Sequence, residues 1–225
     1  SKEVVLEVSE VTYGKSLRNV SFNLHKGEIL GIGGLTDCGM HELGKAIFGA
    51  IEPDKGCVRV IPGTVIKNTV DALNMRIAYI PKDRDQESVF LAASIKDNIT
   101  VASTQKTSKL GLISKSKEKK LAQQESKKLS VKMQGINQFV KDLSGGNKQK
   151  VAIAKWLANE SEIFVMDCPT RGIDIGVKAA IYSLMEQLIA EGKSIIMISE
   201  ELPELIGMSD RILIFKDGKI NGEFY

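Results

Sequence analysis

The sequence of 225 residues has few cysteines, few aromatic residues and no long hydrophobic run. Three cysteines, an odd number without a CxxC spacing, do not make a disulfide framework and indicate a reducing compartment. The longest apolar runs, SIIMIS and RILIF, have the length of strands and are far too short to span a bilayer. No basic segment followed by an apolar one opens the chain, so we expect no export.

Neither sign of charge predominates over the whole sequence, because the formal net charge is only +3. Eight lysines between residues 106 and 128 are opposed by two glutamates, without interleaved aromatic residues. This pattern predicts a solvated helix face, with a patch for anionic lipid headgroups as the alternative. Nucleic-acid surfaces usually combine basic with aromatic residues, so we expect no nucleic-acid partner.

What is present is an ordinary globular balance, with 43% hydrophobic and 26% charged residues. Strands are predicted by the apolar segments EVVLEV, VSFNL, EILGIG, CVRVI and RIAYI before residue 81, and EIFVM, SIIMIS and RILIF after residue 161. Helical spacing after EILGIG and over residues 176–192 places helices between strands. Residues 86–160 are polar, lysine-rich and predicted to be helical. The alternation of strands and helices indicates an α/β protein with a parallel sheet, covered by helices on both sides, and a helical insertion.

The segment GLTDCGMHE, residues 34–42, has the outline of a phosphate-binding loop. Gly34 and Gly39 have the spacing of G-x-x-x-x-G-K-[ST], after a strand and before a helix. Met40 stands where the lysine of such a loop belongs, and His41 where its serine or threonine belongs. Without an ammonium for phosphate and a hydroxyl for Mg²⁺, and with the carboxylate of Asp37 in the loop, we expect the loop geometry but little of its phosphate chemistry.

A second motif, LSGGNKQKVAIAKWL at residues 143–157, is followed by EIFVMDCPTRGIDIG at residues 162–176. Ser144 is suited to cap a helix, and two glycines after it allow an anion to approach the helix N-terminus. Together these segments resemble the ATP-binding subunits of ABC transporters, and the resemblance covers essentially the whole chain. The forms GGNKQK and PTRGIDIGVK resemble in particular importers of ribose, galactose, xylose and related sugars, and the C-terminal of the two ABC domains found in tandem there.

The resemblance implies an ABC-type P-loop NTPase domain: a mostly parallel core sheet with helices on both sides, an N-terminal antiparallel β part and an inserted helical subdomain. We expect residues 1–225 to form a single nucleotide-binding domain, with its core at roughly 1–85 and 160–225 and the helical subdomain at roughly 86–159. The implied cofactors are ATP and Mg²⁺. The implied partners are a second ABC domain, on the same natural chain, and membrane permease subunits that hold the domain at the cytoplasmic face of the cell membrane.

The resemblance also assigns a role to individual positions. Asp167 ends the Walker B strand and would hold Mg²⁺, whereas Cys168 replaces the catalytic glutamate, Glu200 the switch histidine and Lys82 the Q-loop glutamine. The expected nucleotide-binding positions are Tyr13, Gly34, Leu35, Thr36, Asp37, Cys38, Gly39, Met40, His41 and Lys82. The intact positions are those of the signature, Ser144, Gly145, Gly146 and Asn147, and of the D-loop, Gly172 and Asp174.

The departures all fall on the face that would bind this domain's own nucleotide. The sequence therefore predicts a degenerate domain without catalytic residues of its own, which supplies its signature in trans to the ATP site of a partner domain. The alternatives are a catalytically active ABC ATPase with atypical motifs, or a soluble ABC protein that acts on ribosomes or DNA.

Four smaller expectations concern cysteines, histidines and the tryptophan. A nucleophilic Cys168 with His41 as its base, and a metal site formed by Cys38, His41, Asp167 and Cys168, are chemically conceivable, but the spacing in the sequence supports neither. We expect His25 to be solvated and Trp156 to lie in the core.

Overall fold

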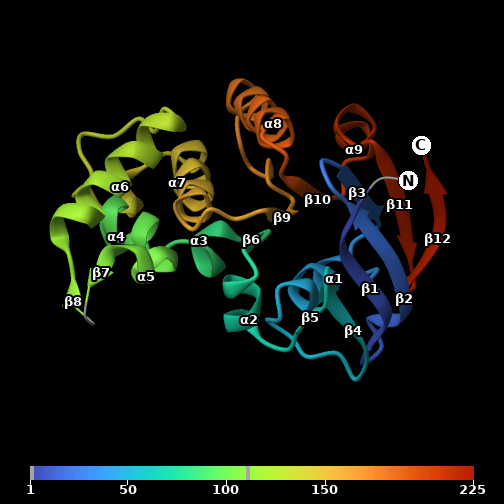
Figure 1. Ribbon diagram of the computed structural model, residues 1–225. Helices are drawn as coiled ribbons and strands as arrows, with labels where there is room; N and C mark the ends of the chain where they lie inside the picture. Colours follow the sequence, from blue (N-terminus) through green and yellow to red (C-terminus); the bar gives the residue numbers. More distant parts are fainter. Residues whose placement is uncertain (1–2, 110–111) are drawn as a thin grey trace. The chain divides into compact units, whose positions relative to one another are not determined.

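The structure is a computed structural model that describes residues 3–109 and 112–225 (Figure 1). The chain divides into two compact units. The first contains the residues up to Lys82, Glu162–Pro169 and Tyr182–Tyr225. The second contains Asp83–Ser161 and Thr170–Ile181. The boundaries expected from the sequence for a single domain stay a prediction.

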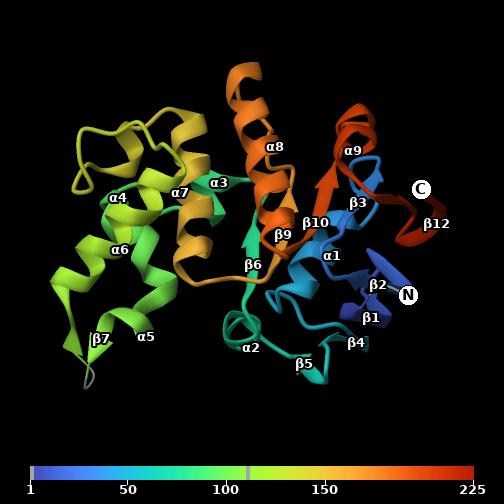
Figure 2. The same cartoon turned by 45° about the horizontal axis from the view of Figure 1, so that its top comes forward.

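A six-stranded sheet forms the centre of the first unit (Figure 2). Its order is β12-β11-β3-β10-β9-β6. The strands are β3 (Ile29–Gly34), β6 (Ile77–Ile80), β9 (Ile163–Asp167), β10 (Ser194–Ser199), β11 (Arg211–Lys216) and β12 (Lys219–Phe224). All neighbours are parallel except β11 and β12. The mostly parallel sheet is confirmed, and the carboxyl ends of β3, β6, β9 and β10 lie at one edge of it.

A second, antiparallel sheet is formed near the N-terminus, as expected. Its order is β2-β1-β4-β5, with β1 (Val4–Tyr13), β2 (Leu17–His25), β4 (Lys55–Val60) and β5 (Thr64–Ile66). The sequence patterns did not predict β5 or the short helix α2 (Thr69–Asn74), because segments of three and six residues carry too little periodicity.

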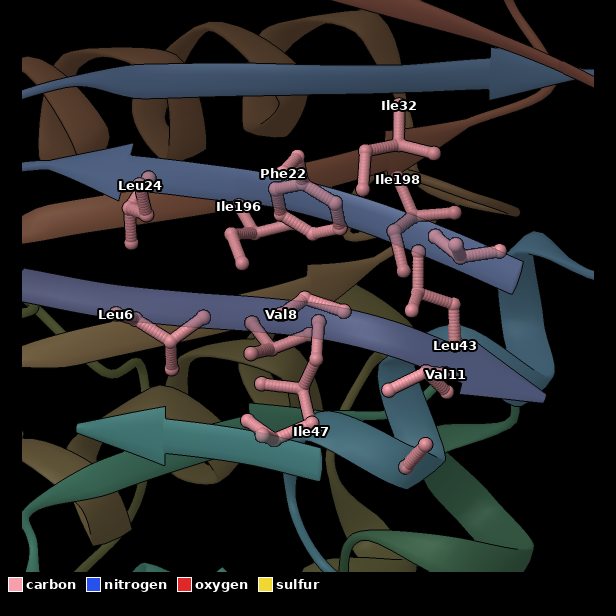
Figure 3. Packing of buried hydrophobic residues seen from close by; sticks show 14 of the residues in the cluster. Leu6, Val8, Val11, Phe22, Leu24, Ile32, Leu43, Ile47, Ile196 and Ile198 are labelled. Carbon is pink, nitrogen blue, oxygen red and sulfur yellow. The ribbon is translucent and has the colours of Figure 1, made fainter. Parts of the chain in front are cut away.

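The core of the first unit lies between the two sheets and helix α1 (Met40–Ile47) (Figure 3). Leu6 and Val8 of β1 and Phe22 and Leu24 of β2 lie in one cluster with Leu43, Ile47, Ile32, Ile196 and Ile198. Burying a side chain of this size contributes about 1.5–3 kcal/mol. Helix α9 (Leu202–Met208) packs on the opposite face, where a Cβ at Gly33 would lie 2.6 Å from Leu205 Cδ1. Helices on both sides of the sheet are thus confirmed.

The second unit is helical, as the sequence predicts (Figures 1 and 2). Its elements are α3 (Arg84–Glu87), α4 (Ile95–Thr100), η1 (Val101–Ser103), α5 (Thr104–Thr107), the two-residue strands β7 (Ser108–Lys109) and β8 (Leu112–Ile113), α6 (Lys115–Lys128), η2 (Val140–Asp142) and α7 (Gly145–Ala158). Helix α8 (Ile175–Ala190) begins in this unit and ends in the first.

The single-residue expectations for these helices hold. The lysines of α6 are exposed, which confirms a solvated face, and Trp156 of α7 is buried. None of the helices within residues 3–109 and 112–225 has the length and apolar character needed to cross a membrane.

A buried ion pair joins the two sheets of the first unit. Arg211 Nε donates to Glu28 Oε1 at 2.8 Å, and both side chains are buried. Arg211 also donates to the carbonyl of Asn23 in β2, at 2.7 Å, and to Glu223 in β12, at 2.8 Å. Glu28 Oε2 accepts a hydrogen bond from the backbone N–H of His25, at 2.8 Å, and lies 3.0 Å from the His25 ring. The expectation that His25 is merely solvated is therefore wrong, because a buried carboxylate needs every donor within reach.

Replacing Arg211 tests how much this buried pair contributes to the stability of the fold. Arg211→Met leaves Glu28 as an unpaired buried carboxylate, and we expect the free energy of unfolding to fall by about 3–5 kcal/mol. The matched control is Arg59→Met, which breaks an exposed pair with Glu7 and should cost about 1 kcal/mol or less. Urea unfolding of both variants measures the difference. Equal losses would contradict the structural importance of the buried pair.

The same pair predicts a specific dependence of stability on pH. Burial alone would raise the pKa of Glu28, but the hydrogen bonds and charge of Arg211, together with the His25 amide, outweigh it and hold the pKa below its ordinary value of 4.5. The resulting stability is complete above pH 4.5 and is lost as the pH falls through the folded-state pKa. We expect Glu28→Gln to be less stable at neutral pH but to lose less stability on acidification. Urea unfolding in acidic and neutral buffers tests this, and parallel acid curves for both proteins would refute it.

Candidate functional site

The candidate phosphate loop lies between β3 and α1, as its sequence predicts. Gly39 has a φ of 102°, and a Cβ there would lie 2.0 Å from the carbonyl oxygen of Ser16, so only glycine fits. Asp37 also has a positive φ, 66°, which an aspartate tolerates better than most residues. Gly39 caps α1 without a side-chain hydrogen bond. The geometry of a strand, a tight loop and an open helix N-terminus is therefore present.

Met40, at the lysine position of the loop, points into the core and not towards the concave side of the loop. Met40 is 0% exposed and belongs to the hydrophobic core of the first unit. Of the other expected loop residues, Leu35, Thr36 and Asp37 are exposed and Cys38 is buried. The loop thus presents no cationic side chain of its own.

His41, at the hydroxyl position, contacts the end of the Walker B strand. Its Nδ1 lies 2.8 Å from Asp167 Oδ1, and Asp167 is almost fully buried. The hydroxyl of Tyr79 reaches the other carboxylate oxygen of Asp167 at 3.5 Å. Burial alone would lower the pKa of His41, but the hydrogen bond and charge of Asp167 outweigh it and raise this pKa above its ordinary value. The imidazole and the carboxylate therefore hold each other in a partly buried pair.

Glu200, which follows β10, is the second centre of the site. Its Oε1 accepts from Lys82 Nζ at 2.6 Å and from the hydroxyl of Thr36 at 3.4 Å, and lies 3.3 Å from His41 Nε2. Lys82 Nζ is itself 3.2 Å from His41 Nε2. The hydrogen bond from Lys82, with the charges of Lys82 and His41, holds the pKa of Glu200 below its ordinary value. The structure therefore brings His41, Lys82, Asp167 and Glu200 into one network.

Cys168, at the position of the catalytic glutamate, is buried and has a φ of 47°, which is rare for a residue with a side chain. Burial, with the nearby charge of Asp167, raises the pKa of its thiol to about 12. Almost no thiolate then exists at neutral pH, so the metal-free site gives no support to a nucleophilic cysteine. A ring nitrogen of His41, a carboxylate oxygen of Asp167 and Cys168 Sγ nevertheless lie within 4.8 Å of one another. The sequence spacing gave no support to a metal site here, but the structure brings three of the four named residues together; Cys38 is not part of the group.

These residues do not fit the magnesium and triphosphate that the family resemblance implies. One carboxylate oxygen of Asp167, Oδ1, is engaged by His41. Mg²⁺ prefers six oxygen ligands, and the site offers an imidazole in place of a hydroxyl. By the family resemblance, Glu200 would replace a histidine that contacts the γ-phosphate, and a carboxylate there would repel that phosphate. The network instead balances its own charges.

The signature segment belongs to the second unit and begins α7. Ser144 occupies the N-cap position, with φ −63° and ψ 157°, but makes no side-chain cap hydrogen bond. Its Oγ instead accepts from the side-chain amide of Asn147 at 2.9 Å, and Asn147 Oδ1 accepts from the backbone of Lys132. The expectation that Ser144 caps the helix is thus wrong. Its hydroxyl leaves the first-turn N–H groups available for an anion.

The signature glycines are closely packed against the D-loop side of this unit. A Cβ at Gly146 would lie 2.7 Å from Val177 Cγ1, and one at Gly145 would lie 2.8 Å from Arg84 Nη2. Arg84 donates to the carbonyl of Arg171, immediately before the D-loop residue Gly172. Asp174 accepts backbone hydrogen bonds from the first turn of α8. Sequence reasoning missed Arg84, because nothing in its local pattern connects it with residues 171–174.

Tyr13, the expected adenine contact, lies at the end of β1. It is half-buried and packs against the hydrophobic core, which is also a sufficient structural reason for an aromatic residue here. Its role in binding stays a prediction.

Comparison with known proteins agrees with the fold and the motifs. The model of the family described as "ABC transporter" matches residues 17–171. The chain is 41% identical over 222 residues to a ribose import ATP-binding protein of Roseobacter denitrificans, covering 98% of this chain and 43% of the relative. It is 44% identical over 231 residues to a xylose import ATP-binding protein of Thermoanaerobacter pseudethanolicus, covering 99% and 46%. The chain therefore spans less than half the length of these relatives.

Solved structures show the same fold. A dimeric ATP-binding cassette in a post-hydrolysis state, bound to ADP and phosphate, matches with a TM-score of 0.83 at 24% identity and covers 97% of each chain. The protein cbiO1 from Clostridium perfringens, part of the ABC transporter complex cbiONQ, matches with a TM-score of 0.80 at 20% identity and covers 99% of this chain and 88% of that one. Because the family model covers most of the sequence, the chain belongs to the ABC transporter family.

Proposed function

We propose that this chain is the nucleotide-binding domain of an ATP-driven sugar importer, and that its signature segment completes an ATP site whose phosphate loop belongs to a second ABC domain. The sugar assignment rests on the similarity to ribose and xylose import ATP-binding proteins. Those relatives are more than twice as long as the matched region, which leaves room for a second ABC domain in proteins of this kind. The chain corresponds in this proposal to the degenerate C-terminal half.

One observation carries the proposed asymmetry: His41 links Asp167 and Glu200 on the chain's own nucleotide face. The side chains that would hold Mg²⁺ and the γ-phosphate therefore bond to each other. Loss of the loop lysine removes a charge-assisted contact of about 1.5–3 kcal/mol. Repulsion from Asp37 at an exposed position adds about 1 kcal/mol, whereas Lys82 compensates the charge of Glu200. A total of about 3–4 kcal/mol corresponds to roughly 10²- to 10³-fold weaker ATP binding.

The signature, by contrast, has kept what a partner's phosphate requires. The uncapped first turn of α7 offers backbone N–H groups, and the positive end of the helix dipole lies there. Ser144 is exposed and Asn147 is half-buried, so an anion held by another domain can approach Ser144. These features support a role in trans.

The second unit also supports contact with a permease at the cytoplasmic face of the membrane. Phe90 is 61% exposed, in a segment that follows the Q-loop position Lys82. An exposed aromatic side chain suits a protein interface. We propose residues 82–100 as this contact region. No observation favours the other two functions, an active ATPase with atypical motifs or a soluble protein acting on ribosomes or DNA.

The first prediction concerns ATP binding by the isolated chain. Because the loop has no lysine and the remaining charges are paired or negative, we expect a dissociation constant for Mg-ATP above about 100 µM. Isothermal titration calorimetry measures it, with a cassette that carries an intact G-x-x-x-x-G-K-[ST] loop as the positive control. Low-micromolar affinity would contradict the loss of function on this face.

The second prediction separates the two faces in the assembled transporter. Ser144→Arg places bulk where the partner's phosphate would lie, and we expect ATP hydrolysis by the complex to fall at least about tenfold. The comparison variant is His41→Ala on the chain's own face, which should change hydrolysis little when Mg²⁺ is the sole divalent cation. Turnover per complex is the measurement. Equal damage by both substitutions would show that this domain hydrolyses ATP itself.

A further inference from the structure

The group formed by His41, Asp167 and Cys168 contains three different metal-ligand atoms. A histidine ring nitrogen, a carboxylate oxygen and a thiol sulfur lie within 4.8 Å of one another, at a partly buried position between α1 and the end of β9. Zinc bonds of 2.0–2.3 Å in a tetrahedron place ligand atoms about 3.5 Å apart. His41 Nδ1 and Asp167 Oδ1 are already closer than this, at 2.8 Å. Small side-chain rotations therefore suffice to enclose an ion.

The surroundings of these three residues are those of a built metal site. Histidine ligands commonly donate their second ring N–H to a carboxylate, which fixes the ring orientation. His41 Nε2 lies 3.3 Å from Glu200 Oε1, which is such an arrangement. The carboxylate ligand is supported in the same way by the hydroxyl of Tyr79, at 3.5 Å from Asp167 Oδ2. Both orienting contacts exist without a metal in place.

The charges also balance. A divalent ion, the carboxylate of Asp167, the thiolate of Cys168 and a neutral His41 sum to zero. Lys82, the nearest cation, is paired with Glu200 at 2.6 Å, so its charge is compensated within the same site. When the ion binds, the thiol of Cys168 releases its proton to solvent, as does Nδ1 of His41 where the ring is protonated, and His41 keeps a single proton on Nε2, towards Glu200.

We propose that His41, Asp167 and Cys168 form a site for a thiophilic divalent cation of the zinc class, with one coordination position left for water or an external ligand. A mixed nitrogen, oxygen and sulfur donor set selects Zn²⁺ over Mg²⁺, which takes oxygen ligands. The site goes beyond the proposed transport function, because it needs neither ATP nor a partner domain. It assigns a different ligand to the face that has lost its nucleotide chemistry.

Cobalt titration of the metal-free chain tests this site directly. Co²⁺ serves as the probe, because a cobalt–thiolate bond gives a charge-transfer absorption that nitrogen and oxygen ligands do not. We expect this absorption to saturate at one ion per chain and to disappear when Zn²⁺ is added. Cys168→Ser should abolish the absorption. The matched control is Cys38→Ser, at another buried cysteine, in the loop between β3 and α1, which should leave it intact.

Two further variants test the rest of the site. Asp167→Asn should weaken cobalt binding about tenfold or more, and Glu200→Gln should do so through loss of the contact that orients His41. Zn²⁺ should raise the melting temperature of the wild type and Cys38→Ser but not of Cys168→Ser, and the melting curves also show that each variant is folded. Absence of the charge-transfer absorption in the wild type, or its persistence in Cys168→Ser, would overturn the proposal. Because the titration contains no nucleotide, its failure would leave the proposed role of Ser144 standing.

Discussion

The candidate site depends on one constraint: β3, β6, β9 and β10 run parallel within one sheet. Parallel strands have their carboxyl ends at the same edge, and ligand sites of open α/β sheets form there. The phosphate loop, Lys82, Asp167 and Glu200 each lie at or just after the end of one of these strands. Residues separated by as many as 164 positions therefore meet within hydrogen-bond distance.

The sequence was sufficient to predict the long strands and helix α1, and to identify the individual positions of the candidate site. Alternation and helical spacing identified the long strands and α1, since burial imposes a period on sequences of that length. The resemblance then identified Asp167, Cys168 and Glu200 one by one. It described Lys82 and Glu200 as two separate replacements, however, whereas in the structure each neutralises the other. The common strand edge was a signal for this pairing, because both residues follow apolar strands of the same sheet.

Other features depended on side-chain choices that no pattern fixes. Met40 could extend towards the loop or into the core, and the apolar neighbours of α1 decide for the core. Ser144 has two hydrogen-bonding options, the helix N–H groups or the side chain of Asn147, which differ little in energy. The proximity of His41 to Cys168 arises from the packing of α1 against β9, and their separation in the sequence gives no hint of it. Spacing along a chain therefore predicts metal sites only when the ligands lie on one local element.

The replacements on the nucleotide face are mutually consistent. A phosphate loop needs a cation for the phosphates and hard oxygen ligands for Mg²⁺. Met40 in place of the lysine removes the cation, and His41 in place of the hydroxyl removes an oxygen ligand. The same exchange, with Cys168, supplies the softer donors that zinc-class ions prefer. Under these two proposals, one set of substitutions lowers the affinity for Mg-ATP and raises the affinity for zinc-class ions.

The contacts of Arg211 have a consequence for how the chain folds during synthesis. Arg211 bonds to Glu28 and to Asn23, which precede it by 183 and 188 residues. Strand β3, at the centre of its sheet, pairs with β10 and β11, and both are made long after β3 itself. The first unit therefore cannot close its main sheet until β10 and β11 have been made, and its early strands expose unpaired edges in the meantime. The second unit, whose helices lie mostly within residues 83–161, is made as one nearly continuous segment and can become compact first.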